Sequence, residues 1–185
     1  MDEVIGAPDL TVRAITMADR KAVVSLMQTL WGGSEIVVHD EVICPADMPG
    51  YIAEASAEIV GLITYRVAAG RCEVVSLDSL RPRNGIGTTL MAHVEVAAKT
   101  GGCSHVWLIT TNDNLRALRF YQKRGYRIIS VDSGAVDRAR AMKPAIPRIG
   151  AGGIPIRDEL LLLKVLGSDD SLAPRIRVNG NHLVD

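Results

Sequence analysis

The sequence predicts an α/β domain whose central sheet is mixed and mostly antiparallel, with helices packed against it. Short alternating apolar segments in the first half are joined by turn-length connections, which is typical of antiparallel hairpins. Later strands alternate with amphipathic helices, which is typical of strand–helix–strand crossovers. The chain has 185 residues and is 48% hydrophobic, enough for one such domain with a substantial core.

The first elements are a strand and a helix. Asp9–Thr16 alternates apolar and polar residues, which predicts a strand, and Thr16–Trp31 repeats apolar residues at helical spacing. A Gly-Gly pair then ends the helix. Ser34–Gly50 has no clear period and contains Pro45 and Pro49, so we expect mostly loop or a short helix there.

Three strands follow at hairpin spacing, with tight turns at Ala57 and at the segment AAG: Tyr51–Ser56, Glu58–Val67 and Arg71–Leu80.

The second half alternates helices and strands. Its predicted helices are Gly85–Thr100, Asn114–Arg124 and a short one at Val136–Lys143, and its predicted strands are Ser104–Thr111, Tyr126–Ser133 and Asp158–Leu166. Residues 1–166 therefore form one domain. From Gly167 the composition turns to Gly, Ser, Asp, Asn and Pro, so we expect residues 167–185 to be a flexible tail.

Composition narrows the function. Lys+Arg and Asp+Glu both total 21, and a net charge of zero argues against nucleic acid or an acidic membrane surface as partner. No apolar run approaches the ~20 residues of a membrane span. The three cysteines and four histidines are scattered, so no metal site is predicted. We expect a soluble, cytoplasmic protein with reduced thiols.

The segment Leu80–Leu90, LRPRNGIGTTL, places two glycines between a predicted strand and a predicted helix. Glycine lets backbone N–H groups approach an anion, and the start of a helix supplies unpaired N–H donors and a positive dipole end. Arg81 and Arg83 add charge, and Thr88 adds a hydroxyl. The segment fits a pyrophosphate site, and an ordinary helix N-cap with incidental glycines fits it equally well.

Two common phosphate-binding motifs do not match this turn. A phosphate-loop NTPase requires GxxxxGK[ST], and the chain contains no Gly-Lys-Ser or Gly-Lys-Thr. A dinucleotide-binding turn requires GxGxxG, but Leu90 stands at the third glycine position. Antiparallel strands also precede the turn, which the dinucleotide fold does not allow.

The downstream helix carries a second motif, Asn114-x-x-Ala117-x-x-Phe120-Tyr121-x-x-x-Gly125. Together with the glycine turn one strand and one helix earlier, it resembles the GNAT superfamily of N-acetyltransferases. Those proteins carry an [RQ]xxGxG/A pyrophosphate turn and an N-x-x-A-x-x-x-Y helix in this order. The resemblance runs from about Leu10 to Leu166 and implies a GNAT-like acyl-CoA N-acyltransferase fold. One departure is Pro82, which stands where the family usually has Arg or Gln.

The resemblance implies that acetyl-CoA lies where Arg71–Leu80 and Ser104–Thr111 splay apart. Backbone groups near Ser79 and Leu80 would pair with the pantetheine arm, and Asn114 would bind it too, unless Asn114 only caps its helix. The pyrophosphate would rest on Arg83, Asn84, Gly85, Ile86, Gly87 and Thr88.

The resemblance also implies candidate catalytic residues. Tyr121 would donate a proton to the leaving CoA thiolate, although an aromatic side chain there could instead only pack. Glu73 and Asp78 are equal candidates for the base that deprotonates the incoming ammonium. Their odd separation puts them on opposite faces of a regular strand, so they share the cleft only if a β-bulge lies between them.

The function that these residues imply is transfer of an acetyl group from acetyl-CoA to a primary amine, on a small molecule, peptide or protein, by direct attack in a ternary complex. A non-catalytic acyl-CoA-binding regulatory module is one alternative, and a nucleotide-binding α/β domain is another. Met17–Gly50 and Ser133–Arg157 would form the acceptor site. An exposed sheet edge could pair in a homodimer.

Overall fold

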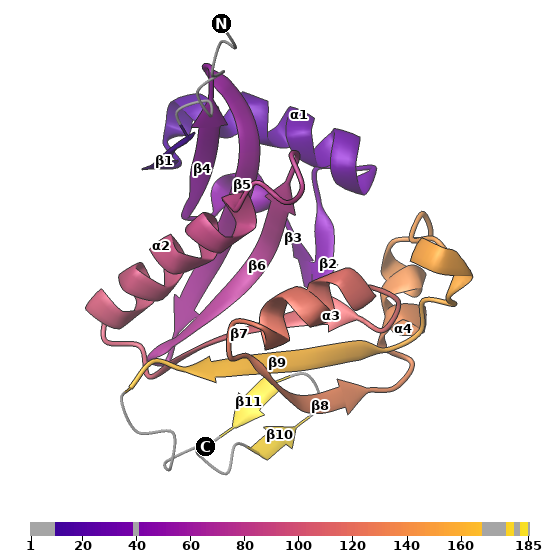
Figure 1. The fold of residues 1–185 in the computed structure, drawn as a ribbon. Coiled ribbons are helices and arrows are strands. Elements are labelled where there is room, and N and C mark those ends of the chain that lie inside the picture. The colour runs from indigo at the N-terminus through magenta and orange to yellow at the C-terminus, as the bar shows by residue number, and fades with distance from the viewer. Residues whose placement is uncertain (1–9, 39–40, 168–176, 180–181, 185) are drawn as a thin grey trace, which may run out of the picture.

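The computed structural model describes residues 10–38, 41–167, 177–179 and 182–184. Its main feature is a seven-stranded sheet with the order β1-β4-β5-β6-β7-β9-β8. Every neighbouring pair is antiparallel except β6 and β7, which confirms the mixed, mostly antiparallel sheet (Figure 1). The strands are β1 (Leu10–Ala14), β4 (Gly50–Ala55), β5 (Glu58–Ala68), β6 (Arg71–Ser79), β7 (His105–Thr111), β8 (Arg127–Asp132) and β9 (Glu159–Val165).

Two tight hairpins join β4 to β5 and β5 to β6, as the sequence predicts. Ser56 and Ala57 have φ values of 53° and 62°, and Ala69 and Gly70 have 49° and 68°. Two successive positive φ values are typical of the two-residue turn that matches the twist of antiparallel strands. These hairpins bring β6 into the middle of the sheet.

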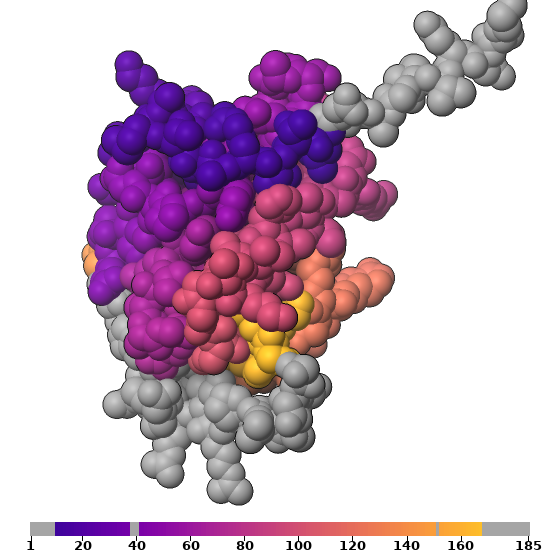
Figure 2. Space-filling view, turned by 90° about the vertical axis from the view of Figure 1, so that its left-hand side faces the viewer, coloured from indigo at the N-terminus to yellow at the C-terminus, as the bar shows by residue number. Residues whose placement is uncertain are grey.

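The helices cover both faces of the sheet. Helix α1 (Arg20–Trp31) buries Val23 and Met27 against one face of β4 and β5. Helix α2 (Ile86–Thr100) and helix α3 (Leu115–Gln122) pack in a second cluster on the other face. Figure 1 shows α2 and α3 in front of the sheet and α1 behind it. In Figure 2 the indigo and purple N-terminal residues lie at the top, and the orange and yellow residues of the C-terminal half lie lower.

The parallel pair β6–β7 is short. It runs from Arg71 opposite His105 to Val74 opposite Leu108, although β6 continues to Ser79 and β7 to Thr111. The two strands therefore separate beyond Val74, and this separation opens the middle of the sheet, as the family resemblance implies.

A β-bulge lies in β6. Thr64 of β5 is opposite Ser76, but the next residue, Tyr65, is opposite Val74, so Val75 is the extra residue. An extra residue shifts the alternation of side chains beyond it by one position. Glu73 and Asp78 consequently share the α1 face of the sheet, which meets the condition that the sequence analysis set for them.

The segment Ser34–Gly50 differs from the expectation of mostly loop. It contains a hairpin of β2 (Ile36–Val38) and β3 (Glu41–Ile43), followed by a single 3-10 turn at Pro45–Asp47. Strands of three residues are too short to show alternation in a sequence.

The remaining elements are one predicted helix, two short turns and a hairpin near the C-terminus. The short helix is confirmed as α4 (Ala135–Met142), and two further 3-10 turns lie at Met17–Asp19 and Ala151–Gly153. In the predicted tail, β10 (Arg177–Asn179) pairs with β11 (His182–Val184), and apart from Gly167 the rest of the tail lies outside the described residues.

Candidate active site

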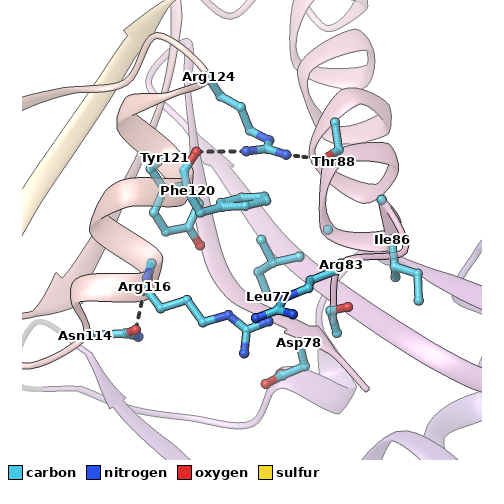
Figure 3. Close-up of a pocket in the computed structure, with 14 residues that line it drawn as sticks. Leu77, Asp78, Arg83, Ile86, Thr88, Asn114, Arg116, Phe120, Tyr121 and Arg124 are labelled. Carbon is cyan, nitrogen blue, oxygen red and sulfur yellow. Dashed lines mark hydrogen bonds between the residues drawn. The ribbon is translucent and has the colours of Figure 1, made fainter. Parts of the chain in front are cut away.

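A cavity of about 470 Å³ lies where β6 ends, between the N-terminus of α2 and helix α3 (Figure 3). Nine of the predicted site residues contribute to its wall, together with five to which the sequence analysis gave no role in the site. The lining residues are Leu77, Asp78, Ser79, Arg83, Gly85, Ile86, Gly87, Thr88, Asn114, Arg116, Ala117, Phe120, Tyr121 and Arg124.

The glycine turn forms one wall of this cavity. Gly85 caps α2 with φ +75°, and Arg83 has φ +72°, a conformation that costs energy for a residue with a side chain. The first N–H groups of α2 have no partner within the helix. Gly87 provides close approach, since a Cβ there would lie 3.2 Å from Cζ of Phe120.

The two arginines beside Pro82 have different surroundings. Arg81 donates to the carboxylate of Glu58 at 3.0 Å, whereas Arg83 lines the cavity. In Figure 3 Arg83 and Arg116 extend into the cavity from its two walls. Arg83, Arg116 and Arg124 outnumber Asp78, the single acid among the lining residues, so the cavity favours an anionic ligand.

Arg124 connects α3 to α2 across this cavity. Its Nη1 donates to the carbonyl of Phe120 at 2.9 Å, its Nη2 donates to the hydroxyl of Thr88, and its guanidinium lies 3.5 Å from the centre of the Phe120 ring. Burial lowers the pKa of Arg124. A positive charge beside the positive end of a helix is unfavourable without an anion, so this arrangement suits a bound phosphate.

Three predicted cofactor contacts have distinct positions. Ser79 lines the cavity, but the N–H of Leu80 donates to the carbonyl of Val60 at 2.9 Å and is already engaged. Asn84 is exposed in the turn and lies outside the lining. Asn114 caps its helix, since its side chain accepts from the N–H of Ala117 at 3.1 Å, and it also lines the cavity.

Tyr121 lies deep in the cavity wall and is 8% exposed. Its ring contacts the rings of Phe120 and Tyr126 edge-on, with centroids 5.1 and 5.8 Å apart. Burial raises the pKa of Tyr121, and the negative charge of Asp78 raises it further. The phenol therefore keeps its proton at neutral pH and can serve as a proton donor.

The two candidate bases on β6 differ in their partners. Glu73 is 3% exposed, and its carboxylate accepts from Nε of Arg66 at 2.5 Å. Burial raises the pKa of Asp78, against the opposing effect of the Trp31 indole N–H, which lies 3.1 and 3.2 Å from its two oxygens. Asp78 lines the same cavity as Tyr121, and Glu73 lines a different one.

This second cavity, of about 190 Å³, includes Asn114 in its wall as well. Trp31, Ile36 and Val37 contribute to it, so part of the segment expected to form the acceptor site does line a cavity. The other expected segment, Ser133–Arg157, contributes none of its lining residues.

Comparison with known sequences identifies the family. The sequence profile described as Acetyltransferase (GNAT) family matches residues 25–126, more than half of the chain. The protein belongs to the GNAT acetyltransferase family. Two Bacillus subtilis proteins are each 44% identical to it: YdhI over 137 residues, 74% of this chain and 86% of that protein, and YxbD over 143 residues, 77% and 90%.

Solved GNAT structures share the fold. The IAA acetyltransferase from Bacillus cereus matches with a TM-score of 0.68 and 21% identity, covering 85% of this chain and 99% of that one. A GNAT acetyltransferase from Elizabethkingia anophelis with acetyl-CoA bound matches with a TM-score of 0.62 and 19% identity, covering 86% and 99%.

Sequence reasoning missed several residues of this GNAT site. Phe120 and Arg124 lie within the quoted helix motif, but nothing in a single sequence shows that they reach α2. Trp31 stands at the end of α1, far from either motif, and only the fold brings it to Asp78. A large aromatic residue next to a Gly-Gly helix stop is the one signal that could have drawn attention to it.

Two negative findings hold for the described part of the chain. No group of three or more His, Cys, Asp or Glu side chains is placed there to hold a metal ion. None of the helices described is both long enough and apolar enough to cross a membrane.

Proposed function

We propose that this GNAT protein transfers the acetyl group of acetyl-CoA to a primary amine by direct attack in a ternary complex. The observation that carries the proposal is that Asp78 and Tyr121, a half-buried acid and a buried phenol, line the same cavity as the glycine turn and its arginines. Base, acid and anion site thus surround one space.

Chemistry in this cavity would proceed in one displacement. Asp78 accepts a proton from the ammonium, and the free amine attacks the thioester carbonyl carbon. A C–N bond forms and the C–S bond breaks, the CoA thiolate takes a proton from Tyr121, and the second proton that the nitrogen loses returns to the Tyr121 phenolate. We assign the base to Asp78 rather than Glu73 because Glu73 is held by Arg66 in the other cavity. The products are an N-acetyl amide and CoA.

The side of the cavity that carries the α2 N-terminus and Arg83 would bind the cofactor. The α2 N-terminus and Arg83 would hold the pyrophosphate, and Asn114 and the end of β6 would contact the pantetheine arm. Acetyl-CoA supplies the activated acetyl group. The acetyl-CoA bound to the Elizabethkingia neighbour and the CoA bound to a Bacillus subtilis acetyltransferase with a TM-score of 0.59 support this assignment.

Calorimetric titration with acetyl-CoA tests the cofactor, with ATP and NAD titrated in parallel. We expect selective binding of acetyl-CoA, weakened at least about tenfold by Gly87→Glu, because the new carboxylate would face the phosphates. Val96→Glu adds the same charge to an exposed position of α2 and should bind normally. Arg83→Ala serves if Gly87→Glu does not fold. Equal binding of ATP or NAD would contradict the cofactor assignment.

Turnover tests the chemistry. A pool of primary amines is incubated with acetyl-CoA and protein, and acetylated products are identified by mass spectrometry. Tyr121→Phe should lower kcat about 10²-fold or more while acetyl-CoA still binds, since general acids typically contribute that much. Binding without turnover on any amine would instead favour the acyl-CoA-binding module.

A further inference from the structure

One tryptophan connects helix α1 to the candidate base. The indole N–H of Trp31 lies 3.1 and 3.2 Å from the two carboxylate oxygens of Asp78, although 47 positions separate these residues in the sequence. A donor shared by both oxygens fixes the rotation of a carboxylate as well as its position. Within the part of the chain that the structure describes, no other hydrogen bond is made to this carboxylate. The orientation of Asp78 therefore depends on Trp31.

The end of α1 holds Trp31 in place. Met27, one turn earlier, is fully buried in the core, and Gly32 ends the helix in the left-handed conformation with φ +67°. Beyond this glycine, Nζ of Lys143 donates to the carbonyl of Glu35 at 2.8 Å, which ties the following segment to the end of α4. The indole is thus presented by an anchored helix end.

The indole ring is partly exposed, although it is large and apolar. Trp31 is 44% exposed, and its ring lines the second cavity with Ile36 and Val37, whereas the Asp78 that it bonds lines the first. An aromatic ring contributes more to stability when it is buried in the core. The contact with Asp78, rather than packing, therefore explains a tryptophan at this position.

The charged and titratable groups around Asp78 come from two other elements. Arg83 precedes α2, and Arg116, Tyr121 and Arg124 belong to α3; all four line the same cavity. The negative charge of Asp78 helps to raise the pKa of Tyr121. Desolvation raises the pKa of Asp78 itself, and the hydrogen bond from the neutral indole on α1 opposes that rise. The indole N–H is thus the contact that favours the ionised carboxylate.

We propose that Trp31 is a positioning residue for the base: its indole N–H keeps the Asp78 carboxylate ionised and in one orientation for the incoming ammonium. This inference rests on the proposed function. One N–H occupies only part of the accepting capacity of two carboxylate oxygens, so lone pairs remain to take the proton. A neutral donor also favours the charged form without neutralising it, as a cation would. Trp31 would therefore orient Asp78 and leave it free to act as a base.

Trp31→Phe tests this role, because it keeps an aromatic ring and removes the N–H. With the primary amine that the protein acetylates fastest, we expect kcat/KM to fall about fivefold on the acid side of its pH profile, as the loss of one neutral hydrogen bond allows. The loss should shrink as pH rises, since Asp78 in the variant binds its proton more tightly and releases it only at higher pH. Leu30→Ala alters an exposed neighbour at the same helix end and should leave the profile unchanged. A loss by the same factor at every pH would overturn the inference while leaving acetyl transfer intact.

Nuclear magnetic resonance of the unaltered protein provides a second test that needs no amine. The chain has two tryptophans, so two indole N–H signals are expected, and Trp31→Phe or Trp107→Phe assigns them. We expect the Trp31 signal to shift through a transition at the pH of the acid limb of kcat/KM, since that limb reports the free enzyme. A Trp31 signal that does not shift there would overturn the inference. Acetyl-CoA binding with no acetylation of any amine would overturn the proposed function, and this inference with it.

Discussion

At the scale of single residues, two carboxylates on one strand have opposite energetics. Glu73 is buried beside Arg66, and the ion pair stabilises the folded state. Asp78 is half-buried with an indole N–H as its neutral donor, and desolvation raises its pKa above the ordinary value of 3.8. A carboxylate whose pKa is raised by desolvation is the pattern expected of a functional group.

Replacing Asp78 with Asn should abolish acetyl transfer and raise the melting temperature at pH 7. Because the folded state binds the Asp78 proton more tightly than the unfolded state, the ionised carboxylate costs stability above its raised pKa. That cost disappears as pH falls toward 3.8, so the stability difference between variant and parent should vanish there. Thermal unfolding followed by circular dichroism across this pH range measures the stability difference, and mass spectrometry of the amine products measures acetyl transfer.

Glu73→Gln is the matched comparison. It removes the ion pair with Arg66 and should lower the free energy of unfolding by about 1–3 kcal/mol at pH 7. If Asp78→Asn instead lowered the free energy of unfolding, the assignment of Asp78 as a functional carboxylate that costs stability would be wrong.

Both carboxylates could be identified from the sequence, but the face of the sheet on which each one lies could not. Their separation is read directly from the chain, whereas the bulge at Val75 depends on how β5 and β6 pair. The same limit explains why Trp31 was missed, since α1 and the end of β6 meet only after the sheet has formed.

At the scale of elements, α2 and α3 are joined at the cofactor cavity by one side chain. Arg124 stacks on Phe120 and donates to Thr88 in the first turn of α2. This contact sets the two walls of the cavity in place and leaves a cation beside the predicted pyrophosphate position. The two helices together therefore form the walls of the proposed cofactor site.

Arg124→Leu should weaken acetyl-CoA binding about tenfold, because a charge-assisted contact and the helix bridge are both lost. Lys123→Leu removes a neighbouring exposed cation from the end of the same helix and should bind normally. Calorimetry on both variants at two salt concentrations measures the effect. An equal loss in the two variants would indicate a general charge effect rather than a specific contact.

Elements with several repeats of a hydrophobic period were predictable, and α2 and β5 are examples. The β2–β3 hairpin was not, because three residues cannot display a period. The position of β9 between β7 and β8 could not be predicted either, because the order of elements along a chain does not determine which strands pair.

At the scale of the whole molecule, burial in the core makes two of the thiols unreactive. Cys72 and Cys103 are buried in the cluster beneath α2, and Cys44 is half-buried. Burial raises the pKa of Cys72 to about 12, and it raises that of Cys103 as well. A thiol in that state is a poor nucleophile at neutral pH.

Incubation with acetyl-CoA in the absence of an acceptor should therefore leave the mass of the protein unchanged. An acetyl-cysteine intermediate would require a thiolate, and the two buried thiols are protonated at pH 7. Intact-protein mass spectrometry detects such an adduct directly, and Cys44→Ser controls for the half-buried thiol. A stoichiometric acetyl adduct on any cysteine would contradict direct transfer.

The strand order has a consequence for how the chain is made. Strands β7 and β8 do not pair with each other, because β9 lies between them and pairs with both. On the ribosome β7 can pair with β6 at once, but its other edge must wait for β9 until the residues from Asn112 to Asp158 have been synthesised, which takes some seconds at about 5–20 residues per second. Strands β1, β4, β5 and β6 can pair during that time. The part of the sheet beneath α3, which forms one wall of the proposed cofactor cavity, is thus completed after the β1-β4-β5-β6 part during synthesis.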